Sequence, residues 1–172
     1  MRAMTQTLLD DAFAHHMWAT LQVMDVCAEL DPGQLEATSL GTYGTILDTL
    51  RHIVSADSGY LFAMTEGKVQ PIDEERMDLA ELRKTTEGFV SEYTALLATD
   101  LDPDRIVVRH REDGSETHAP LGIRLAQVVH HGTDHRSQIC TVLTTLGIEP
   151  PAIDVWDYAD QDGRLTEIPP TA

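Results

Sequence analysis

Hydrophobic residues recur every three or four positions in four long segments of this chain, which is the period that places them on one face of an α-helix. Residues that end helices, chiefly Pro, Gly and Asp, stand between the segments. We therefore expect an all-α fold, a four-helix bundle whose helices turn their apolar stripes inward. The helices are expected over about residues 5–30, 45–65, 78–102 and 120–147.

Residues 104–119 break this period and predict a small hairpin or irregular insert before the last helix. The β-branched run at 106–108, the turn signal Glu112-Asp113-Gly114-Ser115 and the return over 116–119 favour a β-hairpin. A two-stranded ribbon is only marginally stable alone, so we expect it to pack on the helices.

The tail after Pro150-Pro151 carries Val155, Trp156 and Tyr158, and we expect these three side chains to dock on the bundle. The chain has 172 residues and shows no internal repeat, linker or low-complexity block. Its length is typical of one domain. We therefore expect a single helical-bundle domain over residues 1–172, with the last few residues loose.

Acidic side chains outnumber basic ones by 29 to 12, which gives a net charge of −17 with neutral His. Such a surface repels phosphate groups, so neither nucleic acid nor a membrane is expected as a partner. No apolar stretch approaches the roughly 20 residues of a spanning helix. Asp10 and Asp11 precede any apolar run, unlike in a signal peptide. Cys27 and Cys140 fit no paired motif, and a reduced, cytoplasmic protein is the simplest expectation.

Two of the eight histidines, His131 and His135, lie four residues apart in the last expected helix. Their rings project from one face, one turn apart, and can share a divalent ion. The apolar stripe continues through Val128 and Ile139, so both rings are expected to point into the bundle. A buried imidazole without a hydrogen bond costs a few kcal/mol, and a metal ion would satisfy both rings.

His52 is the best candidate for a third ligand, because its flank of the second helix carries small residues that leave room for an ion. Three His ligands with an open fourth position are typical of a catalytic zinc-type site. The alternative is a pair of half-buried histidines that bond to the backbone or to acids on neighbouring helices. An H-x3-H pair by itself does not decide between the two.

The remaining polar residues near these positions have simpler interpretations. His130 is expected at the surface, and His15 or His16 at the rim of the pocket, with one of them facing it as the alternative. Asp134 is expected to be solvated or to orient a ligand. Arg136 would either steer a carboxylate-bearing substrate or form a surface ion pair, the commoner fate.

His110 and His118 on the expected hairpin are most simply cross-strand surface partners. The tail acids do not match the positions of an EF-hand loop, so we expect them to be solvated. They are Asp154, Asp157, Asp160 and Asp162.

At these residues the sequence resembles the DinB-like (DinB/YfiT) superfamily of bacterial helix bundles, over nearly its whole length. The resemblance rests on one upstream His in the second helix combined with a His-Gly-Thr-x-His-Arg segment in the last. The matching stretches are His16–Ala19, Gly41–Ile46, Leu50–Asp57, His131–Arg136 and Leu146–Pro151.

The resemblance implies a homodimer that holds a divalent ion, commonly zinc or nickel, on His52, His131 and His135. Relatives include S-transferases and isomerases that use low-molecular-weight thiols such as bacillithiol or mycothiol. His16 stands where relatives often carry Asn, which leaves the polar chemistry of the pocket open.

Three candidate functions are compatible with these sequence features. The first is a metal-dependent enzyme that activates a low-molecular-weight thiol for S-transfer or isomerisation of a small-molecule substrate. The second is a metal-dependent hydrolase, which needs a general base, and the H-x3-H segment lacks the Glu of H-E-x-x-H. The third is a non-enzymatic metal-binding stress-response bundle, favoured if no substrate-sized cavity adjoins the histidines.

Overall fold

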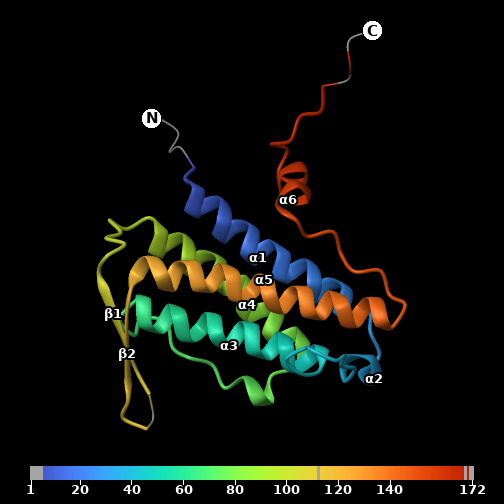
Figure 1. Cartoon of the computed structure of the whole chain (residues 1–172), viewed down its shortest axis with the longest axis horizontal. Helices are drawn as coiled ribbons and strands as arrows, with labels where there is room; N and C mark the ends of the chain where they lie inside the picture. The colour runs from blue at the N-terminus through green and yellow to red at the C-terminus, as the bar shows by residue number, and fades with distance from the viewer. Residues whose placement is uncertain (1–5, 112, 169, 171–172) are drawn as a thin grey trace.

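Four long helices make up the bundle in the computed structural model, which describes residues 6–111, 113–168 and 170 (Figure 1). The long helices are α1 (Leu8–Cys27), α3 (Ile46–Met64), α4 (Leu79–Leu97) and α5 (Leu121–Thr145). Three short helical elements accompany them, namely α2 (Pro32–Leu35), the 3-10 helix η1 (Glu74–Arg76) and α6 (Val155–Gln161). The expectation of an all-α bundle with a small insert before its last long helix is confirmed.

The four expected helices all form, and each ends a few residues inside its predicted bounds. Side-chain caps set the first residues of three of them, α1, α3 and α4. Thr7 accepts a hydrogen bond from the amide of Asp10 and starts α1, while the expected capping box of Asp78 and Glu81 starts α4. Thr5, the predicted start of the first helix, lies outside the described residues.

Each long helix packs on two others: α1 contacts α4 and α5, and α3 contacts the same two helices. Residues on two sides of each helix are therefore buried. Most of the predicted stripe positions are in the core, among them Phe13, Ile53, Tyr93 and Leu125. Among the described residues, no helix is long and apolar enough to cross a membrane.

The expected hairpin forms from β1 (Ile106–His110) and β2 (Glu116–Pro120), which pair antiparallel. Arg124 of α5 ties both strands to the bundle, because one guanidinium nitrogen donates to the carbonyl oxygens of Val107 (2.9 Å) and Thr117 (2.8 Å). Glu112, part of the predicted turn, lies outside the described residues.

The prediction that His110 and His118 pair with each other is wrong. The register sets Val108 opposite His118 and His110 opposite Glu116. Both imidazoles instead contact the Glu116 carboxylate, at 3.0 and 2.7 Å. Both are exposed, as expected.

The tail docks less than predicted. Tyr158 packs against the rings of Trp18 and His15, with centroids 5.5 and 5.9 Å apart. Val155 and Trp156 instead stay 59% and 70% exposed, which contradicts their predicted docking. The reason is that, among the described residues, α6 packs mainly on one long helix, α1, which leaves its other faces open to solvent. Residues 169, 171 and 172, which fall in the segment predicted to be loose, lie outside the described residues.

Candidate metal centre

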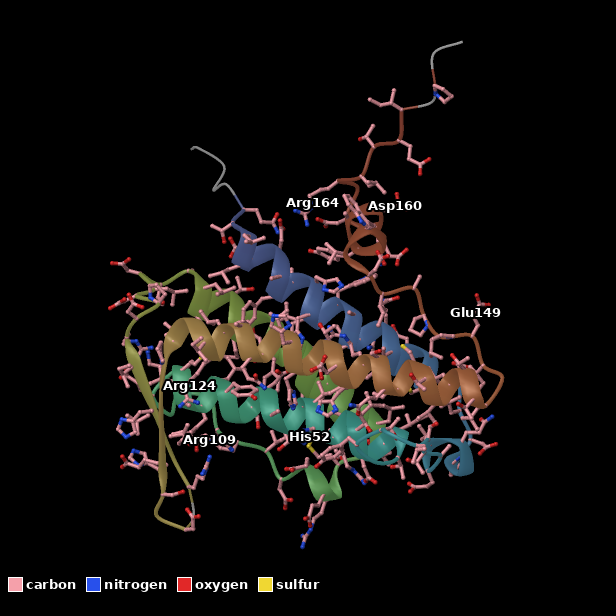
Figure 2. All side chains as sticks on the ribbon, viewed as in Figure 1. His52, Arg109, Arg124, Glu149, Asp160 and Arg164 are labelled. Carbon is pink, nitrogen blue, oxygen red and sulfur yellow. The ribbon has the colours of Figure 1, made fainter. Side chains whose placement is uncertain are left out.

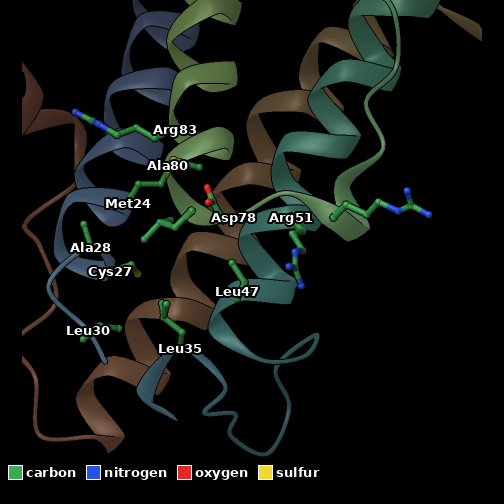
Figure 3. Close-up of a pocket in the computed structure, with 12 residues that line it drawn as sticks. Met24, Cys27, Ala28, Leu30, Leu35, Leu47, Arg51, Asp78, Ala80 and Arg83 are labelled. Carbon is green, nitrogen blue, oxygen red and sulfur yellow. The ribbon is translucent and has the colours of Figure 1, made fainter. Parts of the chain in front are cut away.

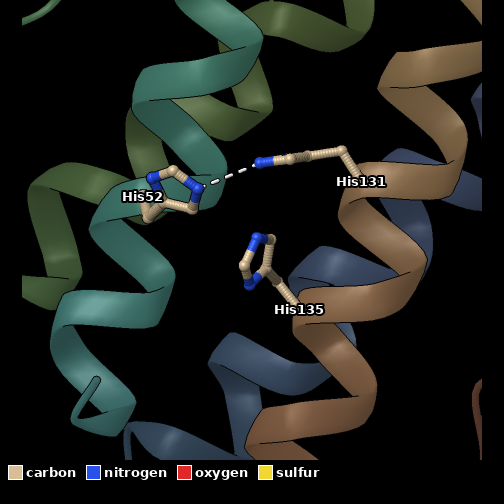
Figure 4. A group of neighbouring side chains, drawn as sticks. All are labelled: His52, His131 and His135. Carbon is tan, nitrogen blue, oxygen red and sulfur yellow. Dashed lines mark hydrogen bonds between the residues drawn. The ribbon is translucent and has the colours of Figure 1, made fainter. Parts of the chain in front are cut away.

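The three predicted histidines come together between two helices. His52 on α3 and His131 and His135 on α5 each offer a ring nitrogen, and these atoms all lie within 4.8 Å of one another (Figure 4). The Nε2 atoms of His52 and His131 are 3.0 Å apart. All three residues are half-buried, so the cluster lies at the edge of the core and not inside it.

Two neighbours orient these rings. Tyr43 lies flat on His52, with centroids 4.0 Å apart and planes 14° from parallel. The Gln138 side-chain oxygen, which accepts from the Tyr43 amide at 2.9 Å, also lies 3.1 Å from Nδ1 of His135. An amide oxygen only accepts, so Nδ1 carries the proton and the Nε2 lone pair of His135 stays free.

Burial keeps His131 and His52 in the neutral form that binds metals. Desolvation, reinforced by the neighbouring His135 and His52, lowers the pKa of His131 to about 4. Desolvation also lowers the pKa of His52, with a smaller contribution from His135, and the nearby Glu74 carboxylate opposes that shift. Both rings are therefore neutral imidazoles at pH 7, and each presents the lone pair of one ring nitrogen.

A divalent ion fits this donor set. In a tetrahedral site with Zn–N bonds of about 2.1 Å, neighbouring nitrogens lie roughly 3.4 Å apart, and the observed cluster needs only small side-chain adjustments to reach that spacing. Three neutral imidazoles suit zinc, nickel, cobalt or iron. The cluster can hold an ion and leave one coordination position open.

A groove of 590 Å³ opens beside His52 toward the start of α3. Tyr43 and His52 form one wall, and three carboxylates and one guanidinium supply most of the remaining polar surface. Those charged side chains are Asp48, Glu74, Glu75 and Arg51. Arg51 is engaged with the Met77 carbonyl and with Asp48, so the groove is acidic.

A second polar cluster lies behind the histidines and joins all four long helices. Arg136 of α5 donates to Nδ1 of His16 on α1 at 2.9 Å. Since Arg only donates, the His16 proton is on Nε2, which donates to the Asp57 carboxylate of α3 at 3.1 Å. The Tyr93 hydroxyl of α4 donates to the same carboxylate at 3.2 Å. These four residues are at most 2% exposed, and we call them the buried network.

Gly132 makes room for the buried network. A Cβ atom at this position would lie 2.2 Å from Cε1 of His16 and 2.7 Å from Nη1 of Arg136. A side chain of any kind would therefore displace the His16 ring or the guanidinium.

The buried network corrects three sequence-based expectations. Arg136 neither forms a surface ion pair nor faces the groove, because it is 2% exposed and bonded to His16, Thr20 and Thr133. His16 lies in the core and not at the rim. Asp57, which was not predicted to contribute, is buried beside it; the mid-helix Gly132 was the one available signal of a close approach.

The expectations for His130 and Asp134 are confirmed. His130 and Asp134 are exposed, next to the cluster in sequence but on the outer face of α5. The expectation that His15 lies at the rim of the pocket is wrong. His15 is buried against the tail, where its Nε2 donates to the Ile153 carbonyl at 2.9 Å.

A separate cavity of 530 Å³ lies where α2 meets the ends of α1, α3 and α4 (Figure 3). Its lining is mainly apolar and includes Met24, Leu35 and Leu47. Cys27 borders it, but the thiol is fully buried and its pKa is raised to about 12 by desolvation. The three histidines do not line this cavity, so it is separate from their cluster.

Comparison with known proteins agrees with this fold. A family model described as the DinB family matches residues 4–168. A crystal structure of a DinB-like protein from Bacillus cereus ATCC 10987 superposes with a TM-score of 0.61 at 19% identity, covering 88% of this chain and 100% of the other. No curated protein sequence matches the chain.

Proposed function

The chain belongs to the DinB family, and on that ground we propose that it binds one divalent metal ion through His52, His131 and His135 and activates a low-molecular-weight thiol for S-transfer or isomerisation. The observation that carries the proposal is the convergence of three imidazoles from α3 and α5, with ligand atoms within 4.8 Å. Zinc and nickel are the ions we expect first.

When bound, the ion supplies Lewis acidity that turns a thiol into a nucleophile at neutral pH. The protein supplies the rest. Gln138 holds His135 in the tautomer that leaves Nε2 free, and Tyr43 fixes the plane of His52 by stacking. The groove beside His52 offers 590 Å³ for a substrate, which favours an enzyme over a purely structural metal site.

Glu74 gives a specific reason to retain metal-dependent hydrolysis as the second candidate. Its carboxylate lines the groove and is close enough to His52 to raise the pKa of that ring against the effect of burial. A carboxylate in this place can act as the general base that the H-x3-H segment lacks.

Metal content is the first test. Protein purified without a His tag should carry about one divalent ion per chain, by the single three-ligand site. Replacing His131 or His135 with Ala should abolish this, while His130→Ala, an exposed neighbour on the same helix, should leave it unchanged. Stoichiometric metal in a His131→Ala/His135→Ala double variant would contradict the site.

The reaction needs its own test. Metal-loaded protein should conjugate a thiol with a chlorinated or epoxide acceptor, and Glu74→Gln should leave this rate nearly unchanged. Hydrolysis of activated esters that falls with Glu74→Gln, without any thiol conjugation, would favour the hydrolase instead.

A further inference from the structure

Two arginines lie near each other where the hairpin covers the end of the bundle. Arg109 lies on β1 and Arg124 near the start of α5 (Figure 2). Their charges are near enough that Arg109 contributes to lowering the pKa of the Arg124 guanidinium, after desolvation. Two like charges near each other destabilise a fold unless an anion compensates them.

Arg124 is a buried cation that its surroundings satisfy only in part. It is 6% exposed, its Nη2 donates to two strand carbonyls, and its Nε has no hydrogen-bond partner. Over the described residues, neither Arg124 nor Arg109 forms an ion pair with a carboxylate. A buried charge left this way destabilises a fold, so its retention calls for a reason.

Arg109 faces a groove that small residues of α3 leave open. Its Nη2 would lie 4.0 Å from a Cβ on Gly59, so the absence of a side chain there keeps the guanidinium accessible. The groove has a volume of 550 Å³ and includes the hydroxyl residues Ser55 and Ser58. Its other polar lining residues are His110, Arg111 and Asp113, of which Asp113 accepts from the Ser115 amide.

We propose that this groove is an anion subsite, in which the Arg109 guanidinium binds a terminal carboxylate or phosphate group of the substrate. The guanidinium fork matches the planar geometry of these oxyanions. Arg124 supplies a fixed, buried charge, and Arg109 supplies an accessible one on the hairpin.

The subsite lies along the bundle from the three histidines. Arg124 precedes His131 by seven residues, which is two helical turns, so both side chains leave the same face of α5 about 10 Å apart. Tyr60 of α3 lies beside His131, with its ring centroid 6.1 Å from that of His131. Glu74 and Glu75 line the groove on the other side of His52. An elongated substrate would therefore bind with its anionic end toward the hairpin and away from these carboxylates.

The link to a substrate rests on the proposed function, but the subsite does not require the metal. Arg124 by itself has a structural role in holding the hairpin, so Arg109 is the better residue to change. Its side chain makes no hydrogen bond in the described structure, and Arg109→Gln should fold as the wild type does. Lys84→Gln is the matched control, because Lys84 is an exposed cation on α4, which lies apart from α5.

Calorimetric titration of metal-free protein with inorganic phosphate and with glutarate tests the proposal. At least one probe should bind, and Arg109→Gln should weaken its binding about tenfold or more, as expected for a lost charge-assisted hydrogen bond. Lys84→Gln, with the same change in net charge, should bind as the wild type does. Binding of neither probe, or equal binding by Arg109→Gln, would overturn the subsite.

The same titration on His131→Ala separates this proposal from the metal site. Probe binding should persist in His131→Ala, and metal content should persist in Arg109→Gln. If His131→Ala loses the metal but still binds the probe, the anion subsite is supported independently of the metal-dependent function. Retained metal with no probe binding would overturn the subsite alone.

Discussion

Gly132→Ala should destabilise the bundle although it replaces a poor helix former with the best one. A mid-helix Gly→Ala change normally stabilises by about 1 kcal/mol. Here the new Cβ would lie 2.2 Å from Cε1 and 2.5 Å from Nδ1 of His16, and 2.7 Å from Nη1 of Arg136. Carbon atoms pack at roughly 3.5–4.0 Å, so the His16 ring must move by more than 1 Å in a region with no free volume.

The displacement breaks hydrogen bonds as well as packing. His16 is held at 2.9 Å by Arg136 and at 3.1 Å by Asp57. Overpacking costs about 1–3 kcal/mol, and a buried donor or acceptor left without its partner costs about 1–3 kcal/mol more. After subtraction of the gain in helix propensity, we expect a loss of about 3 kcal/mol, or roughly 6–12 °C in Tm for a chain of this size.

Urea denaturation of the metal-free variant measures this loss, with Gly88→Ala as the control. Gly88 is exposed within α4, and a Cβ there meets no atom within 4 Å, so this change should stabilise by up to about 1 kcal/mol. Adding His16→Ala to Gly132→Ala removes the obstructing ring. The double variant should therefore lose less free energy of unfolding than the sum of the losses of the two single variants. A Gly132→Ala variant as stable as the wild type would refute the tight contact.

Two further results follow from the titrating groups. The pKa of His131 is lowered to about 4 in the folded chain and is near 6.5 in the unfolded chain. Between these two pH values the unfolded state binds more protons than the folded state. The free energy of unfolding of the metal-free protein should therefore be unaffected by His131 above pH 6.5 and should fall on acidification toward pH 4. In urea titrations at pH 7 and 4.5, His131→Leu should show a smaller fall, and an identical fall would contradict this assignment. The Cys27 thiol is buried, and its pKa is raised to about 12. In folded Cys140→Ser protein at pH 8 it should not react with a disulfide reagent, whereas in denaturant it should react fully. Rapid reaction in the folded protein would contradict the burial of Cys27.

Helical periodicity predicts the long helices, and its interruption over residues 104–119 together with the turn residues predicts the hairpin, but neither signal predicts the short elements. A helix of four residues, such as α2, or of seven, such as α6, spans too few turns for a hydrophobic period to be visible. The first residues of α1 and α4 are set by the caps Thr7 and Asp78. The hydrophobic period locates the ends of a helix only to within a few residues. The His110–Glu116 register depends on the turn, which composition does not determine.

The three histidines are predictable from sequence because their spacing and the apolar stripe assign them to one inward face. The buried network is not, because a stripe describes one face, whereas each long helix in this bundle packs on two neighbours. Asp57 is about 140° around α3 from His52, taking roughly 100° per residue. That angle points away from α5 but toward α1 and α4, which supply His16 and Tyr93.

One turn of α5 therefore serves both clusters. His131 and His135 face α3, while Gly132 and Arg136, each one residue further on, face α1. Arg136 and Asp57 belong to the same two helices as the candidate ligands, and His16 links them, so the separation of α3 and α5 at the histidines depends on the buried network. Since a metal site tolerates errors of only about 0.5 Å in its ligands, Gly132→Ala should weaken metal binding together with stability, while Gly88→Ala should leave metal affinity unchanged. Equal metal affinity in both variants would show that the histidines hold their positions independently of the network behind them.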